Sequence, residues 1–210
     1  MSSYENYVKD FPCRILKLYE KYLDSVRLDR LEVTFLLSLT ASGIAVPLDR
    51  LRPNLFPNGR PRPHPDPFED RKKFEDAAKR FDELSIKHFM ESELWHSCFE
   101  KWKYGKCRSG NIEPDSWKEL CLARPTGDFY SVKQVIEHLR DSLAHGVIST
   151  NTDKEKEITE INLFTGKKKN GLKVLSVTPH SLGIFLRKWV DWLQTLDVSI
   201  WSKCDSPVKS

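Results

Sequence analysis

The residues best suited to chemistry are Arg140, Asp141 and His145, which lie close together in the chain. Asp141 and His145 are four positions apart, the spacing at which a carboxylate on a helix can accept a hydrogen bond from an imidazole and fix its tautomer. Arginine suits phosphate binding, because its planar guanidinium donates two parallel hydrogen bonds. Together the three side chains are able to bind a phosphate group and to transfer a proton.

An amphipathic helix is expected to position these residues. Ser131 is placed to cap its start and Gly146 to cap its end. At about 100° per residue, the apolar side chains cluster on one side, whereas Asp141 falls about 180° and His145 about 220° from the first apolar residue. The polar residues are therefore expected opposite the core, and the long side chain of Arg140 can lean toward them. The apolar series is Val132, Val135, Ile136, Leu139 and Leu143.

The spacing alone is a weak signal, because arginine and histidine also meet at this spacing by chance. A solvated polar helix face is the alternative interpretation. The context favours a site, since the residues end a helix with an apolar opposite face and are followed by glycine, a predicted hairpin and a last helix. His138 falls at about 240° on the same projection and is a secondary candidate, although a lone exposed histidine is more often incidental.

A β-hairpin is expected after this helix. Residues 157–164 and 172–177 have strand character and flank a turn with two glycines. Thr178–Pro179 then supplies an N-cap and a first helical residue for a final, tryptophan-rich helix. A lysine run at the hairpin tip is either a solvated loop or a contact for phosphates. Its members are Lys167, Lys168 and Lys169.

The earlier part of the chain is expected to be helical around one irregular segment. Residues 52–68 hold half of the chain's 12 prolines, which predicts an extended surface loop. This loop is either a stiff connector or a basic arm directed toward a partner. One apolar helix is expected to stop at Gly43, because glycine and a later proline disfavour its continuation. The predicted helices are 12–29, 31–42, 69–104 as one helix or two in series, and a short one at 115–122.

We therefore expect a mainly α fold, a helical bundle with a β-hairpin inserted before the C-terminal helix. The length of 210 residues favours a single domain over residues 1–210. Within it we expect a proline-rich surface loop at 52–68, the hairpin at 157–177 and a flexible tail at 202–210.

Composition restricts the class of protein. With 39% hydrophobic and 30% charged residues, the chain has the composition of a soluble globular protein, and its net charge of +4 is compatible with an RNA partner. It shows neither a secretory signal nor an apolar run long enough for a bilayer, so we expect a cytoplasmic protein without a membrane partner. The five cysteines are irregularly spaced, which predicts free thiols.

No metal and no other cofactor is expected. A zinc site is the weaker interpretation, because no Cys-x-x-Cys pair is present and the spacings are not typical of zinc ligands. The residues for such a site would be His96, Cys98, Cys107 and Cys121.

The motif residues resemble the R-x4-H motif of the HEPN superfamily, in which Asn, Asp or His often follows the arginine. Arg140, Asp141 and His145 match these positions. The apolar second helix before the motif, and the hairpin and tryptophan-rich helix after it, are similar to small stand-alone bacterial HEPN proteins. The resemblance covers residues 10–200, of which only the motif is specific.

The resemblance implies a helical bundle that forms a homodimer, with two motif helices facing one another around one RNA-binding cleft. It implies a metal-independent endoribonuclease that leaves a 2′,3′-cyclic phosphate. His145 would then transfer protons, Arg140 would stabilise the phosphate and the transition state, and Asp141 would orient His145 or contact RNA. His138 and the lysines of the hairpin tip would be RNA contacts.

The resemblance also suggests a biological setting, a toxin or an anti-phage effector with a cognate antitoxin or another regulator as partner. The competing interpretation is a non-catalytic HEPN-like module that binds RNA, a nucleotide or a protein and keeps only the bundle and the dimer. A further alternative makes the tryptophan-rich last helix an assembly surface, but core packing explains its tryptophans more simply.

Overall fold

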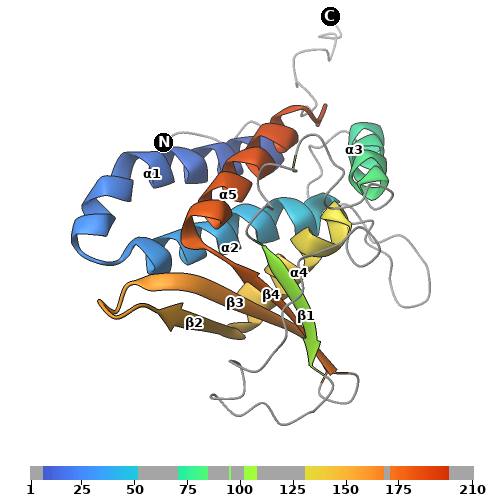
Figure 1. Ribbon diagram of the computed structural model, residues 1–210. Coiled ribbons are helices and arrows are strands. Elements are labelled where there is room, and N and C mark those ends of the chain that lie inside the picture. The colour runs from blue at the N-terminus through green and yellow to red at the C-terminus, as the bar shows by residue number, and fades with distance from the viewer. Residues whose placement is uncertain are drawn as a thin grey trace, which may run out of the picture.

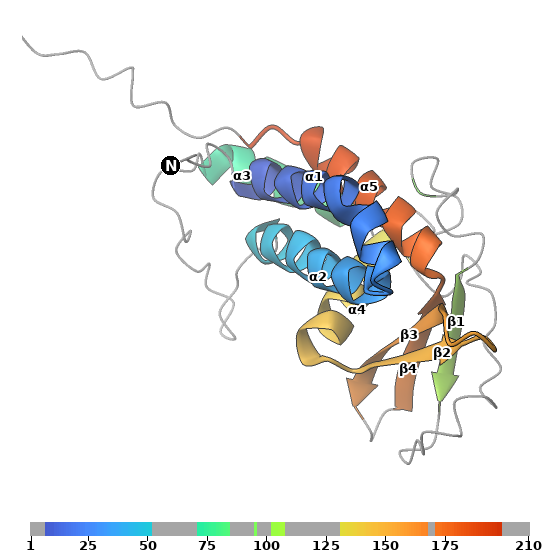
Figure 2. The same cartoon turned by 90° about the vertical axis from the view of Figure 1, so that its left-hand side faces the viewer.

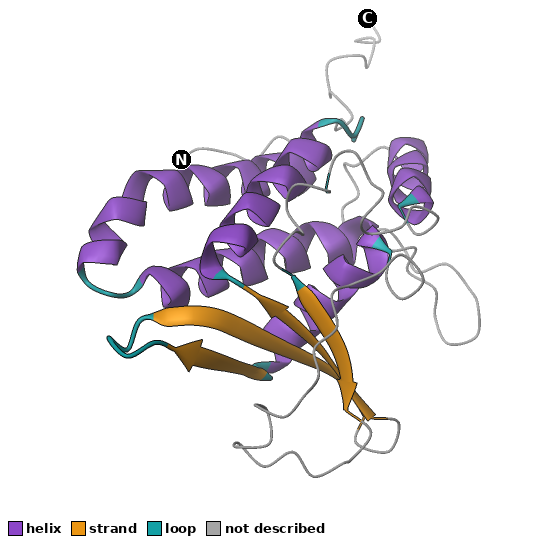
Figure 3. Cartoon of the chain, viewed as in Figure 1, coloured by secondary structure: helices purple, strands orange, loops and turns teal. Residues whose placement is uncertain are grey.

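The computed structural model describes residues 7–51, 71–84, 95, 102–107, 131–167 and 171–198. Helices predominate in these parts of the chain and gather on one face of a small antiparallel sheet (Figure 1 and Figure 3). The predicted fold class is therefore confirmed. In chain order the elements are α1 (Tyr7–Leu28), α2 (Glu32–Leu51), α3 (Arg71–Glu83), β1 (Lys103–Cys107), α4 (Val132–His145), β2 (Ile148–Thr152), β3 (Ile158–Lys167), β4 (Gly171–Val177) and α5 (Pro179–Gln194).

The sheet contains the predicted hairpin and is wider than expected. Its strand order is β1-β4-β3-β2, so the β3–β4 hairpin is central and a further strand pairs with each of its edges. β2 follows α4 directly and pairs with β3, and β1 pairs with β4. The expectation that the helical pattern of 69–104 continues to Tyr104 was wrong, because Lys103 and Tyr104 begin β1. Neighbouring strands, not local periodicity, decide the structure there.

The predicted end of the second helix at Gly43 was also wrong, because α2 continues through Gly43 and Pro47 to Leu51. A proline inside a helix leaves the carbonyl four residues earlier without its backbone donor. For Pro47 that carbonyl belongs to Gly43, and it accepts a hydrogen bond of 2.9 Å from the indole Nε1 of Trp189 in α5. A distant side chain thus replaces the hydrogen bond that the proline removes.

The helices pack around α2, which contacts α1, α3, α4 and α5 (Figure 2). Gly43 permits this packing, since a Cβ there would lie 3.3 Å from Leu186 Cδ1 and 3.4 Å from Ile15 Cγ2. The length and apolar composition of α2 also fit a membrane span, but a core helix has the same features. The core face of the sheet adds Ile161, Leu163, Leu175 and Val177.

Tryptophans of α5 lie in this core. Trp189 stacks on Trp192 with ring centroids 5.3 Å apart, and Phe81 of α3 packs against both rings. Both tryptophans are buried, which supports a packing role for them. Trp201 lies outside the described residues.

Several predictions concern parts of the chain that the structure does not describe. These are the proline-rich loop at 52–68, the short helix at 115–122 and the tail at 202–210. Of the helical pattern predicted for 69–104, the structure describes α3, Leu84, Trp95 and residues 102–104.

Candidate functional site

The helix that carries the motif, α4, has the boundaries that its sequence predicts. Ser131 Oγ accepts from the Gln134 backbone N–H at 3.2 Å, and the Gln134 side chain accepts from the Ser131 N–H at 2.9 Å. This reciprocal pair satisfies two donors that a helix start otherwise leaves free. At the other end, Gly146 adopts a left-handed φ of 65°, and its N–H donates to Ser142 O. Both caps are local, so α4 ends at His145 for reasons contained in its own sequence.

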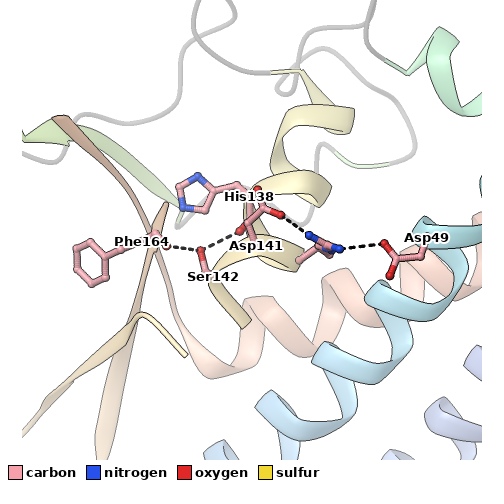
Figure 4. A network of polar contacts seen from close by, with 6 residues as sticks. Asp49, His138, Asp141, Ser142 and Phe164 are labelled. Atoms are coloured by element: carbon pink, nitrogen blue, oxygen red, sulfur yellow. Dashed lines mark hydrogen bonds and ion pairs between the residues drawn. The ribbon is translucent and has the colours of Figure 1, made fainter. Parts of the chain in front are cut away.

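Two side chains of α4 contact the backbone of strand β3, and Figure 4 shows the contact made by Ser142. His138 Nε2 lies 2.9 Å from Leu163 O, and Ser142 Oγ lies 2.9 Å from Phe164 O and 2.8 Å from His138 O. Both residues are buried. The backbone also contributes, because the Phe164 N–H donates to Val147 O at 3.0 Å. The C-terminal half of α4 is therefore held rigidly against the sheet.

His138 does not lie on an exposed polar face, as the helix projection predicted, because its relative exposure is only 3%. β3 covers this side of α4, a long-range contact that a projection of one helix cannot include. Burial lowers the pKa of His138 to about 4, and the hydrogen bond to the Leu163 carbonyl opposes that shift only in part. At neutral pH the ring is uncharged and donates its Nε2 proton to Leu163 O. His138 therefore packs against the sheet, whereas the predicted contact with RNA needs an exposed side chain.

Arg140 lies between two carboxylates. Its Nη1 donates to Asp141 Oδ1 at 2.9 Å, and its Nη2 donates to Asp49 Oδ1 of α2 at 3.1 Å (Figure 4). The side chain is 27% exposed, so one part of the guanidinium still faces solvent. The hydrogen bond to Asp141 is the largest of the effects that raise the pKa of Arg140 above its usual value. The arginine is therefore charged and held in one orientation.

Asp49 is a site residue that the sequence did not reveal. It lies beyond the predicted end of the second helix, and 91 positions separate it from Arg140. Only the continuation of α2 past Pro47 brings it to α4. Asp49 and Arg50 are the charged residues that end the long apolar stretch of α2, and this is the local signal that could have drawn attention to Asp49.

His145 is exposed at the end of α4. Within the part of the chain that the structure describes, no hydrogen bond or ion pair joins it to Arg140 or Asp141. Asp141 instead accepts from Arg140, so the predicted contact between Asp141 and His145 is not formed in this arrangement. Gln134, Asp141 and His145 follow one another at helical spacing along the outward side of the helix, and the neighbouring Val147 side chain is 43% exposed.

The lysine run of the hairpin is described only at its beginning. Lys167 is the last residue of β3, and its side chain lies outside the described part. Lys168 and Lys169 lie outside it altogether. Their proposed contacts with RNA stay predictions.

Among the described residues, no group of three or more His, Cys, Asp or Glu side chains is placed to hold a metal ion. His96, Cys98, Cys121 and the side chain of Cys107 lie outside those residues.

In a single chain, the arrangement separates its functional groups. Arg140 points along the side of α4 that faces α2, whereas His145 is directed to solvent at the end of the helix. A phosphate could be bound by the exposed part of the guanidinium, and a proton could be exchanged by the imidazole. Within the described residues, one chain thus brings the guanidinium of Arg140 and the exposed imidazole of His145 to the C-terminal end of α4.

Comparison with curated proteins and with solved structures finds no match for this chain. Comparison with family models finds one that covers residues 1–199, described as HEPN pEK499 p136. The match spans all the elements described above, including the four strands and the capped helix with Arg140 and His145. The chain belongs to this HEPN family.

Proposed function

We propose that this protein is a metal-independent endoribonuclease that acts as a homodimer. The observation that carries the proposal is the end of α4, where a fixed arginine, an exposed histidine and an exposed valine lie within eight residues of one another. HEPN membership suggests a nuclease or a nucleotide-binding helical module. The arginine and the histidine favour the nuclease, because their chemistry matches what RNA cleavage requires.

The dimer supplies what one chain lacks. Metal-free cleavage by the RNA 2′-hydroxyl needs a base, an acid and a cation, and the described residues of one chain offer a single exposed imidazole at this end of α4, that of His145. A second copy related by a twofold axis through the outward side of α4 would contribute a second His145 and a second Arg140. Val147 is an apolar group at the same place, suited to the centre of such an interface.

The proposed reaction is a transfer within the RNA. One His145 removes the proton from the 2′-hydroxyl, whose oxygen attacks the adjacent phosphorus. The guanidinium groups of Arg140 stabilise the extra negative charge of the phosphorane. The bond from phosphorus to the 5′-oxygen breaks, and the His145 of the second copy gives that oxygen a proton. The products are a 2′,3′-cyclic phosphate and a 5′-hydroxyl.

Asp141 and Asp49 hold Arg140 ready for this step. Their carboxylates fix two edges of the guanidinium and compete with an incoming phosphate for it. We assign Asp141 the role of a positioning residue for Arg140. For Asp141 to orient His145 as well, its side chain would have to rearrange when RNA binds or when the dimer forms.

The test uses total RNA and the full chain with excess EDTA. The wild-type protein is expected to cleave, and Arg140→Ala and His145→Ala are each expected to reduce cleavage by at least about 100-fold. Arg187→Ala is the matched control, because Arg187 also pairs with a carboxylate, Glu20, but lies on α5. End-group analysis should find cyclic phosphates.

Cleavage that survives both motif substitutions would contradict the proposal. RNA binding without cleavage by a dimeric wild-type protein would favour the competing function, a non-catalytic HEPN module. We further propose a cytoplasmic toxin or anti-phage effector, controlled by an antitoxin or another regulator. Expression of the active protein should then arrest growth, and expression of His145→Ala should not.

A further inference from the structure

A pocket of about 540 Å³ lies at the opposite end of α2 from Arg140. Three connections form it: the turn between α1 and α2, the turn between β2 and β3, and the start of α5. These segments meet on the left-hand side of the molecule in Figure 1, the side that faces the viewer in Figure 2. Its size falls within the range of small-molecule sites, about 300–1,000 Å³.

Some charged residues that line the pocket pair with each other, and others do not. Arg27 pairs with Glu32 at 3.1 Å, so these two lining residues largely neutralise one another. Arg30, Lys156 and His180 line the same pocket, and within the described residues their side chains make no ion pair or hydrogen bond. Three donor groups from three different segments are thus available to an anion.

Two of these cations are carried by closed turns. The Arg30 N–H donates to Arg27 O at 3.0 Å. The Lys156 N–H donates to Asp153 O at 3.2 Å, and Asp153 Oδ1 accepts from two further backbone N–H groups of the same turn. Backbone that is already ordered loses less conformational entropy when a ligand binds. The third donor, His180, lies in the first turn of α5, where the helix dipole also favours an anion.

The rest of the lining argues for an organic ligand. Val33, Ile158 and Pro179 give the pocket an apolar wall, and its volume is larger than a bare phosphate needs. Glu32 and Glu157 interrupt the positive lining, which disfavours a long polyanion such as an RNA strand. We propose that this pocket binds a small organic phosphomonoester, with the phosphate at Arg30, Lys156 and His180 and the organic body against the apolar wall.

The pocket is separate from the proposed ribonuclease site. Val33 of α2 lines the pocket, and Asp49 of α2 contacts Arg140. The 16 residues of helix from one to the other span roughly 25 Å. A ligand here therefore cannot share a phosphate with Arg140 of the same chain. Binding of a phosphomonoester at this pocket does not depend on cleavage activity.

Calorimetric titration of the full chain with phenyl phosphate tests the proposal, alongside inorganic phosphate and benzyl alcohol. Phenyl phosphate is expected to bind more tightly than either of the others, because only it offers both the charge and the apolar body. Titrations with glucose 6-phosphate and adenosine monophosphate then show which organic body the wall prefers. Arg30→Gln and Lys156→Gln should each weaken the binding of phenyl phosphate by about tenfold, because each replaces a charged hydrogen-bond donor with a neutral one.

Lys154→Gln is the matched control, because Lys154 is an exposed lysine of the same turn that does not line the pocket. It should bind phenyl phosphate as the wild type does. The double variant Arg140→Ala/His145→Ala should also bind normally, even if it has lost all ribonuclease activity. Absence of binding by the wild type, equal affinity for inorganic phosphate, or an equal loss in Lys154→Gln would each overturn the proposal.

Discussion

Arg140 donates hydrogen bonds to two carboxylates, Asp141 on its own helix and Asp49 on α2. An arginine in this position is well oriented, but its charge is already compensated. A phosphate that approaches the guanidinium must therefore compete with at least one carboxylate. Asp49 is the more exposed of the two partners, so it is the one that a phosphate could displace more easily.

Replacement of Asp49 with asparagine should strengthen RNA binding. Asp49→Asn keeps the size of the side chain and removes one negative charge beside Arg140. We expect the affinity for RNA to rise about three- to tenfold at low salt, with little loss of stability because exposed ion pairs contribute about 1 kcal/mol or less. The measurement is fluorescence polarisation with a 2′-O-methylated RNA, which cannot be cleaved by 2′-hydroxyl attack.

Asp197→Asn is the control for this change, since it removes a carboxylate that pairs with Lys73 at 3.3 Å in a different part of the molecule. It should leave RNA affinity unchanged. Weaker binding by Asp49→Asn would show that orientation of Arg140 matters more than compensation of its charge.

The buried His138 makes stability depend on pH. Its pKa is lowered to about 4 in the folded protein, whereas the unfolded chain has the ordinary value near 6.5. Between these two values the unfolded state binds more protons, so the free energy of unfolding falls as the pH decreases through this window. The full loss in the free energy of unfolding is on the order of 3 kcal/mol. No loss from this group is expected above about pH 7.

His138→Gln tests this effect, because a glutamine amide can still donate to Leu163 O but does not titrate. Urea unfolding should be compared at several pH values from 4 to 7.5. The wild type should lose more stability toward acid than the variant does. Parallel pH profiles for the two proteins would mean that His138 is not the group responsible.

Local signals determined which helices and strands the sequence could predict. Ser131, Gln134 and Gly146 cap α4 through contacts within a few residues, and the bounds of that helix were predicted correctly. Thr178 and Pro179 did the same for the start of α5. The hairpin was recognisable for the same reason, because both strands and their turn are adjacent in the chain.

The features that the sequence did not predict depend on contacts between distant parts of the chain. β1 has the sequence Lys-Tyr-Gly-Lys-Cys, which carries little strand preference, and it is a strand because β4 lies beside it. The burial of His138 depends on β3, and the contact of Asp49 with Arg140 depends on the length of α2. The motif could be found from local sequence, but the partners of its residues could not.

The continuation of α2 through Pro47 leads to a prediction about the hydrogen bond between Trp189 and Gly43. Trp189→Phe removes the indole donor and leaves Gly43 O without a hydrogen bond, which should cost about 1–3 kcal/mol in addition to any loss of packing. Pro47→Ala supplies a backbone N–H that can reach the same carbonyl. We therefore expect Pro47→Ala to be more favourable in the Trp189→Phe background than in the wild type.

Urea unfolding of the wild type, both single variants and the double variant measures this coupling. The effects of Pro47→Ala on the unfolded chain are common to both backgrounds and cancel in the cycle. Additive single effects would contradict the proposed exchange of donors. In that case apolar packing alone would have to explain why α2 continues through Pro47.

Val147 directly follows Gly146, the C-cap of α4, and is one of the exposed large hydrophobic residues of the described structure. The backbone of Val147 is fixed, because its N–H donates to Ser142 O at 3.1 Å and its carbonyl accepts from the Phe164 N–H at 3.0 Å. The residue is nevertheless 43% exposed. An exposed apolar residue with a fixed backbone, two positions after the exposed His145, is well suited to the centre of a twofold interface.

Val147→Glu should therefore separate the dimer without unfolding the chain, because two like charges would meet at the twofold axis. Light scattering after gel filtration should give twice 24.5 kDa for the wild type and 24.5 kDa for the variant, and RNA cleavage should be lost with the dimer. Leu18→Glu is the matched control, since Leu18 is also 43% exposed but lies on α1, and it should remain dimeric and active. A monomeric wild type that cleaves RNA would contradict the shared site, because each His145 would then have to act without a second imidazole.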